Sequence, residues 1–187
     1  PGPAMRPASP VARGTRGLWT KSLDEGLHAA TSVPTFAAGL RHSRGKAGSP
    51  ELAAYLASIP NAGRREMGIQ PILDGPRAGN VPPALKLFET TIRDIERSLG
   101  EAPWLAGEAY SLADAGLTPY LKRLDMLQLS DLWAGLPNVS GWYERVRALP
   151  NYAPAVEAYI SPQMVEKFAA GGAECHQAFM EALQGVE

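Results

Sequence analysis

The spacing of apolar residues between positions 82 and 99 is the feature that most constrains the fold. Alternating steps of three and four residues separate Leu85, Phe88, Ile92, Ile95 and Leu99. This spacing places all five side chains on one face of an α-helix. Two prolines open the stretch and Gly100 follows it, as is typical of a helical first turn and a C-terminal cap. The pattern predicts an amphipathic helix with a buried apolar face.

Similar periodicity predicts helices over residues 18–34, 112–129 and 137–150, and Pro34 is expected to end or kink the first of them. No stretch alternates apolar and polar residues between turn signals, so no strand is predicted. The expected fold class is therefore all-α, a helical bundle. Residues 42–81 are rich in glycine and proline and are expected to form a loop-rich insert within it.

The domain organisation expected from the sequence is one helical domain over residues 18–160, followed by a helical tail over 161–187. Residues 1–17 hold four prolines and three glycines, a composition typical of a linker or an engineered chain end. We expect this segment to be extended.

Charge and composition exclude several classes of partner. Lysine and arginine number 18 against 19 acidic residues, and no basic stripe recurs, so nucleic acid is not an expected partner. No apolar run has the length of a membrane span, and no signal peptide is recognised. The single cysteine, Cys175, excludes an intrachain disulfide. A cytoplasmic location is expected.

Residues Ser111 and Asp114 precede an apolar helical run in the arrangement of a capping box. The serine hydroxyl is expected to accept a hydrogen bond from the Asp114 N–H, and the carboxylate to accept one from the Ser111 N–H. We therefore predict a structural role for Asp114 in preference to a catalytic one.

Cys175 and His176 invite a nucleophile or a metal site. Three histidines and one cysteine do not supply a convincing ligand set, so no metal is expected. No activating partner for the thiol is evident, and the surrounding AAGGAE (169–174) is expected to be mobile. A short helix is expected over 174–183.

Several landmarks then occur in a fixed order: WLAGEAYSLAD (104–114), PY (119–120), PNVSGWYERV (137–146) and LP (149–150). This series resembles the C-terminal helical domain of cytosolic glutathione transferases, in which the serine and aspartate form the capping box of a central buried helix. The segment LWTKSLDEGLH (18–28) resembles the first helix of that domain in a bacterial branch that includes the β-etherases. The resemblance covers about residues 18–154.

The resemblance implies a reaction in which glutathione thiolate attacks a hydrophobic electrophile, by conjugation or by ether cleavage. Glutathione, the co-substrate, would bind an N-terminal thioredoxin-like domain that is not found in this sequence. Val33-Pro34 and Val81-Pro82 are the candidates for its cis-proline motif, but each borders a helical pattern. The chain alone is therefore expected to be inactive, with its catalytic residue in the missing domain.

The resemblance also implies that the substrate pocket is bordered by residues 19–31 and 113–123. The candidate substrate-binding residues are Trp19, His28 and Tyr120. The alternatives are that Trp19 and Tyr120 are ordinary core residues, and that His28 is a surface histidine paired with Asp24 or Glu25. A homodimer is expected, with an exposed apolar patch on the first and middle helices. The alternative function is a non-catalytic helical module that binds a hydrophobic ligand or a protein.

Overall fold

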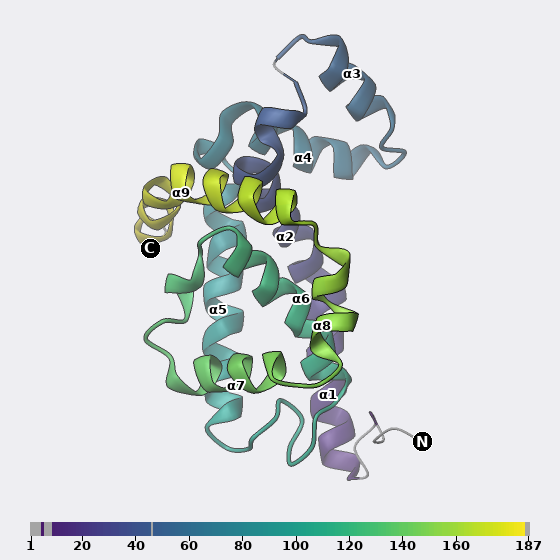
Figure 1. Ribbon diagram of the computed structural model, residues 1–187, viewed down its shortest axis with the longest axis vertical. Helices are drawn as coiled ribbons and strands as arrows, with labels where there is room; N and C mark the ends of the chain where they lie inside the picture. Colours follow the sequence, from purple (N-terminus) through teal and green to yellow (C-terminus); the bar gives the residue numbers. More distant parts are fainter. Residues whose placement is uncertain (1–4, 6–8, 46, 186–187) are drawn as a thin grey trace. The chain divides into compact units, whose positions relative to one another are not determined.

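The computed structural model describes residues 5, 9–45 and 47–185, which are helical along most of their length (Figure 1). The α-helices are α1 (Pro10–Ser22), α2 (His28–Pro34), α3 (Pro50–Ala57), α4 (Ala62–Asp74), α5 (Val81–Leu99), α6 (Leu112–Met126), α7 (Pro137–Arg147), α8 (Tyr152–Ala155) and α9 (Pro162–Gln184). The shorter segments are two π-helices, η1 (Leu23–Leu27) and η2 (Thr35–Leu40), and four 3₁₀-helices, η3 (Arg41–Ser43), η4 (Gly75–Arg77), η5 (Ser130–Leu132) and η6 (Glu157–Tyr159).

The predicted all-α fold class is confirmed. Within the described ranges no β-strand forms, and the single pairing of extended backbone is an isolated bridge between Trp104 and Gly107. The chain divides into two compact units. The domain boundaries expected from the sequence stay a prediction.

The first unit contains residues 1–28, 89–122 and 130–161. It combines α1 and η1 with the second half of α5, most of α6, and α7. Its interior is made of large apolar side chains, among them Leu23, Leu27, Ile92, Ile95, Leu105, Leu117, Leu121, Val139, Trp142 and Val146. The helix predicted from Pro137 is confirmed as α7, whose buried residues lie at three- and four-residue spacing.

The second unit contains residues 29–88, 123–129 and 162–187. Here α9 packs closely on backbone: a Cβ added to Gly171 would lie 2.1 Å from the Ala38 carbonyl oxygen, and one added to Gly172 would lie 2.0 Å from that of Leu127. Both glycines are therefore required by close approach of neighbouring backbone. The expectation that residues 169–174 are mobile is wrong, because they lie inside α9 and contribute to this packed contact.

The strongest sequence prediction is confirmed by α5. It begins one residue before the predicted range and ends at Leu99, and all five periodic apolar residues are buried. The predicted helix over 112–129 is confirmed as α6, which ends at Met126. Their strong periodicity made both elements readable from the sequence alone.

The expectation that residues 1–17 are extended is wrong from Pro10 onward, where α1 begins. Residues 1–4 and 6–8 lie outside the described residues. The proline that suggested a linker occupies the first helical position, where its fixed φ favours a helix and its missing N–H costs nothing. Proline content was therefore the wrong signal at this position.

The α-helix predicted over 18–34 ends at Pro34, as expected, although the backbone continues in another helical form. It passes from α1 through η1 into α2, and a π-helix, η2, begins directly after Pro34. A proline lacks the N–H that continues an α-helical ladder, and a wider turn is one way in which the backbone continues past such a residue.

The insert over 42–81 is mainly helical, so its expected loop-rich character is wrong. Ser49 and Asn61 begin α3 and α4: their side chains accept hydrogen bonds from Leu52 N–H at 3.2 Å and Arg64 N–H at 3.0 Å. A serine followed by proline, and an asparagine before a helical stretch, are N-cap signals that were present in the sequence.

Candidate functional site

Asp114 is fully buried and lies at the centre of a hydrogen-bond network in the first unit. Its carboxylate accepts from the Ser111 N–H at 2.8 Å and from the Ser111 hydroxyl at 2.9 Å. It also accepts from the Leu105 N–H at 3.0 Å and the Trp142 indole N–H at 2.9 Å. The bond from the Ser111 N–H is the one expected of a capping box.

One detail of that expectation is wrong. The Ser111 hydroxyl oxygen accepts from the Ala113 N–H at 3.2 Å, rather than from the N–H of Asp114. The four donors around the Asp114 carboxylate come from Trp142 in α7, from Ser111 directly before α6 and from Leu105 in the preceding loop. They leave no oxygen of Asp114 directed to solvent, which supports a structural role.

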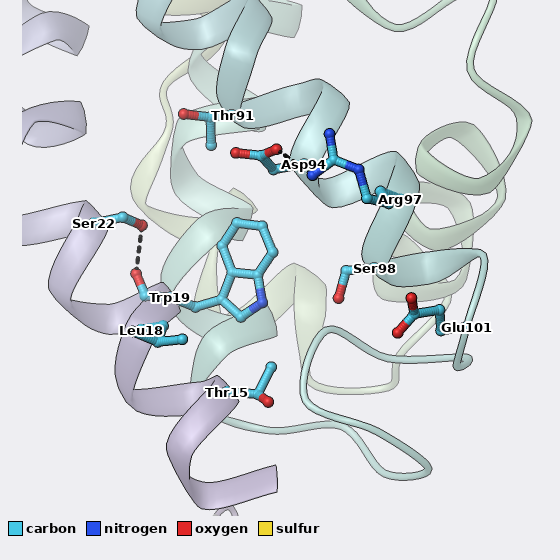
Figure 2. A pocket seen from close by; sticks show the side chains of 9 residues that line it. All are labelled: Thr15, Leu18, Trp19, Ser22, Thr91, Asp94, Arg97, Ser98 and Glu101. Carbon is cyan, nitrogen blue, oxygen red and sulfur yellow. Dashed lines mark hydrogen bonds and ion pairs between the residues drawn. The ribbon is translucent and has the colours of Figure 1, made fainter. Parts of the chain in front are cut away.

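Trp19 lies in a pocket of about 410 Å³ between α1 and the C-terminal half of α5. We call this cavity the Trp19 pocket. Figure 2 shows the indole projecting from α1 into the space between the two helices. Its N–H donates to the Leu105 carbonyl oxygen at 3.1 Å, which fixes the ring in place. The pocket is lined by Thr15, Leu18, Trp19, Ser22, Thr91, Asp94, Arg97, Ser98 and Glu101.

His28 and Tyr120 contact each other directly. The Tyr120 hydroxyl lies 3.3 Å from Nδ1 of His28, and the rings meet edge to face with their centroids 6.3 Å apart. Burial and the nearby Asp24 carboxylate raise the pKa of the Tyr120 hydroxyl, so the phenol keeps its proton at neutral pH. His28 is exposed, and the pair can therefore present polar groups to solvent or to a ligand.

The sequence offered two acidic partners for His28, and the structure gives it a tyrosine instead. Glu25 forms an exposed pair with Lys21 at 3.5 Å. The π-helix η1 ends immediately before His28. Its extra residue shifts the angular position of every later side chain relative to an α-helix, and no local sequence signal marks such a shift.

The three proposed substrate residues therefore do not form one site. His28 and Tyr120 lie together, whereas Trp19 lines a pocket to which neither contributes. Sequence reasoning missed the part of α5 that faces Trp19. The residues Thr91, Asp94 and Ser98 recur at three- and four-residue steps, which was an available signal for a shared polar helix face.

Cys175 is buried, and its thiol lies 3.7 Å from the Ala37 carbonyl oxygen. Burial, reinforced by the Glu174 carboxylate, raises the pKa of this thiol. A protonated, enclosed thiol is a poor nucleophile. Among the residues that the structure describes, no three His, Cys, Asp or Glu side chains are grouped as a metal site would require.

Sequence reasoning also missed a side-chain contact in the second unit, where His42 Nε2 lies 2.9 Å from the Glu174 carboxylate, within hydrogen-bond distance. The two residues are 132 positions apart, and no local pattern links them. Among the described residues, no helix has the length and apolar character needed to cross a bilayer.

Comparison with known proteins gives a family match. Residues 64–145 match the model of the glutathione S-transferase C-terminal domain. The chain is 42% identical over 64 residues, 33% of its length, to glutathione S-transferase F14 from Arabidopsis thaliana. It is 28% identical over 68 residues, 36% of its length, to tetrachloro-p-hydroquinone reductive dehalogenase from Sphingobium chlorophenolicum.

Among solved structures, β-etherase LigF from Sphingobium sp. strain SYK-6 is similar, with a TM-score of 0.68 and 21% sequence identity. This match covers 84% of the present chain and 66% of the β-etherase chain, and it shows a shared fold. The sequence matches span 25% and 27% of the two relatives' own lengths. The chain therefore matches only a part of each of these proteins.

Proposed function

We propose that this chain, whose residues 64–145 match the model of the glutathione S-transferase C-terminal domain, supplies the hydrophobic-substrate side of a glutathione transferase. The observation that carries the proposal is this match, together with a fold shared with a β-etherase over most of the chain. Fold alone does not fix function, so the proposal also draws on the geometry of the first unit.

The proposed reaction is nucleophilic substitution at an electrophilic carbon. The thiolate sulfur of glutathione forms a bond to that carbon, and the leaving group departs with the electron pair of the bond that breaks. In an aryl ether the leaving group is a phenolate, and in a halide it is a halide ion. The thiolate and the carbon must be held close together. We propose that the thioredoxin-like domain holds the thiolate and that the helical domain holds the carbon.

We place His28 and Tyr120 at the electrophile. The Tyr120 phenol, which keeps its proton at neutral pH, and the exposed imidazole offer hydrogen bonds to an oxygen of the substrate. Each ring also offers an apolar face to an aromatic group. Trp19 lines a separate pocket.

Glutathione itself would bind a thioredoxin-like domain outside these 187 residues. Such a domain is built on a β-sheet, and the described part of this chain contains none. We further propose that the chain alone is inactive, that the protein works as a homodimer, and that it is cytoplasmic. Self-association is supported by apolar side chains on α1, where Val11 and Leu18 are 80% and 72% exposed.

The first test is a titration of this chain with reduced glutathione, followed by calorimetry at neutral pH. We expect no saturable heat. Saturation at one site would contradict the proposal that glutathione binding belongs to another domain.

The second test is a titration with 2-phenoxyethanol, a water-soluble aryl ether, followed by ¹H–¹⁵N chemical shifts. We expect saturable shifts at residues 24–28 and 116–122. Tyr120→Phe should weaken binding, because it removes the phenolic hydrogen bond while keeping the ring. Tyr159→Phe is the matched control, since Tyr159 is 82% exposed. Absence of saturable shifts would contradict the placement of the electrophile.

The alternative is a free-standing helical module that binds a hydrophobic ligand or a protein. This alternative also predicts binding of the aryl ether, so binding alone does not separate the two proposals. They are separated by adding a separately expressed thioredoxin-like domain from the same genome. Formation of a glutathione conjugate from 1-chloro-2,4-dinitrobenzene, faster than with either protein alone, would support the transferase.

A further inference from the structure

Four hydrogen-bond donors around the Trp19 pocket, the Trp19 indole N–H and three hydroxyl groups, donate to backbone carbonyl oxygens, and this limits the ligands that the pocket can accept. We propose that it binds a protonated primary amine attached to an aromatic or apolar body. The proposed ligand is a cation rather than an electrophile, and its binding does not depend on the function proposed above.

Three of the four hydroxyl groups that line the pocket already donate their protons to backbone carbonyl oxygens. Thr15 donates to a carbonyl oxygen of α1 at 3.3 Å, and Ser22 does the same at 2.8 Å. Ser98 donates to a carbonyl oxygen of the loop after α5 at 3.3 Å. Each oxygen keeps lone pairs, so the three groups can accept a hydrogen bond from a ligand but have no proton left to donate.

The charged side chains of the lining also favour a cationic ligand. Asp94 and Arg97 form an ion pair at 2.9 Å, so the guanidinium is already neutralised by a carboxylate of the pocket. Glu101 adds a second carboxylate, and no ion pair to Glu101 forms within the described ranges. The lining therefore carries one net negative charge, which favours a cation and disfavours a carboxylate or phosphate.

The indole of Trp19 supplies the apolar surface. Its N–H is committed to the Leu105 carbonyl, so the ring presents its π-face and edges to the pocket rather than a donor. Figure 2 shows the ring between the two helices, with Asp94, Ser98 and Glu101 on the α5 side. A tryptophan face attracts ammonium groups through its quadrupole and stacks with aromatic rings.

A primary ammonium satisfies both requirements, because it carries a positive charge and three N–H donors. A quaternary ammonium offers the charge without donors, and an alcohol offers one donor without the charge. The lining is partly exposed, with 47% of the Asp94 side chain and 74% of Arg97 accessible. Solvent screening therefore places the expected dissociation constant in the millimolar range.

The experiment follows the indole ¹H–¹⁵N signal of Trp19, assigned by its loss in Trp19→Phe, during three titrations at pH 7 and constant ionic strength. The probes are benzylammonium, benzyl alcohol and benzyltrimethylammonium, which share the aromatic ring. We expect saturable shifts that are tightest for benzylammonium. Equal affinity for benzyl alcohol would overturn the proposal, as would equal affinity for benzyltrimethylammonium or the absence of saturation with benzylammonium.

Two variants test whether the Glu101 carboxylate contributes to binding of the ammonium group. Glu101→Gln should weaken benzylammonium binding about two- to five-fold, as expected for one screened carboxylate, and should leave benzyl alcohol unaffected. Glu108→Gln is the matched control, because Glu108 is exposed in the same loop region but does not line the pocket. Unchanged benzylammonium affinity in Glu101→Gln would contradict the assignment even if the wild-type titration saturates.

Discussion

The indole N–H of Trp142 donates a 2.9 Å hydrogen bond to the carboxylate of Asp114, and both residues are fully buried. This contact joins α7 to the start of α6. Because the same carboxylate also holds the Leu105 N–H, one acidic side chain orients two helices and the loop that precedes α6. Its removal would leave several donors buried without an acceptor.

The first prediction concerns this network. Asp114→Asn should lower the free energy of unfolding by about 2–4 kcal/mol, because the amide nitrogen replaces one of two carboxylate oxygens, each of which accepts from two donors. Urea unfolding followed by circular dichroism measures the change. Glu108→Gln should shift it by less than about 0.5 kcal/mol, as is usual at exposed positions. A loss as small as that of the control would contradict the role given to Asp114.

The second prediction concerns Glu96, whose carboxylate lies at the start of α7. Its carboxylate accepts from the Val139 N–H and the Asn138 side-chain amide, both at 2.9 Å, while Leu136 at the N-cap position makes no side-chain cap. Glu96→Gln should destabilise the fold by about 1 kcal/mol, through loss of the charge at the helix N-terminus and of one acceptor. Hydrogen exchange of the α7 amides should accelerate, whereas the exposed Glu157→Gln should leave it unchanged.

The third prediction concerns a steric clash at Gly172 in the second unit. An alanine Cβ would lie 2.0 Å from the Leu127 carbonyl oxygen, so Gly172→Ala should lower the thermal midpoint despite alanine's better helix propensity. Gly141→Ala in α7 is the matched control. Its Cβ would meet only the flexible end of Arg145 at 3.4 Å, and it should stabilise by about 0.5–1 kcal/mol. Equal midpoints for the two variants would contradict the close approach of α9 to Leu127.

The fourth prediction concerns the reactivity of the Cys175 thiol and its dependence on pH. Because burial raises the pKa of its thiol, Ellman's reagent at pH 8 should react slowly with the folded protein and rapidly in urea. The sign for stability follows from the same shift. The stabilisation linked to the neutral thiol is complete below the pKa of the unfolded chain and is lost as pH rises through the higher folded value. Rapid reaction of the folded protein at pH 8 would contradict the enclosure of Cys175.

The helices with regular apolar spacing were predictable, and so was the position of Asp114. In α5 the pattern determines which side chains are buried whatever they pack against, since the helical period alone places Leu85, Phe88 and Ile92 on one face. The bond between Asp114 and Ser111 spans three residues, so local geometry was enough to anticipate it. The family resemblance rests on the same local landmarks.

The candidate sites were predictable only in part. Trp19, His28 and Tyr120 could be named as candidates, but their grouping depends on the π-helical turn before His28 and on which face of α5 meets α1. The helical insert was hidden by prolines, one of which stands at the first position of α3. Composition was misleading there because proline has opposite effects at the start and in the interior of a helix.

The sequence by itself determined the all-α class, the main helices, their buried faces and the capping residues, because these follow from interactions within a few positions of one another. Only the tertiary structure decided that His28 meets Tyr120, that Trp19 faces the polar side of α5, and that Asp114 reaches Trp142. Those contacts join residues 28 to 92 positions apart. They depend on how helices pack, which the periodicity of a single helix leaves undetermined.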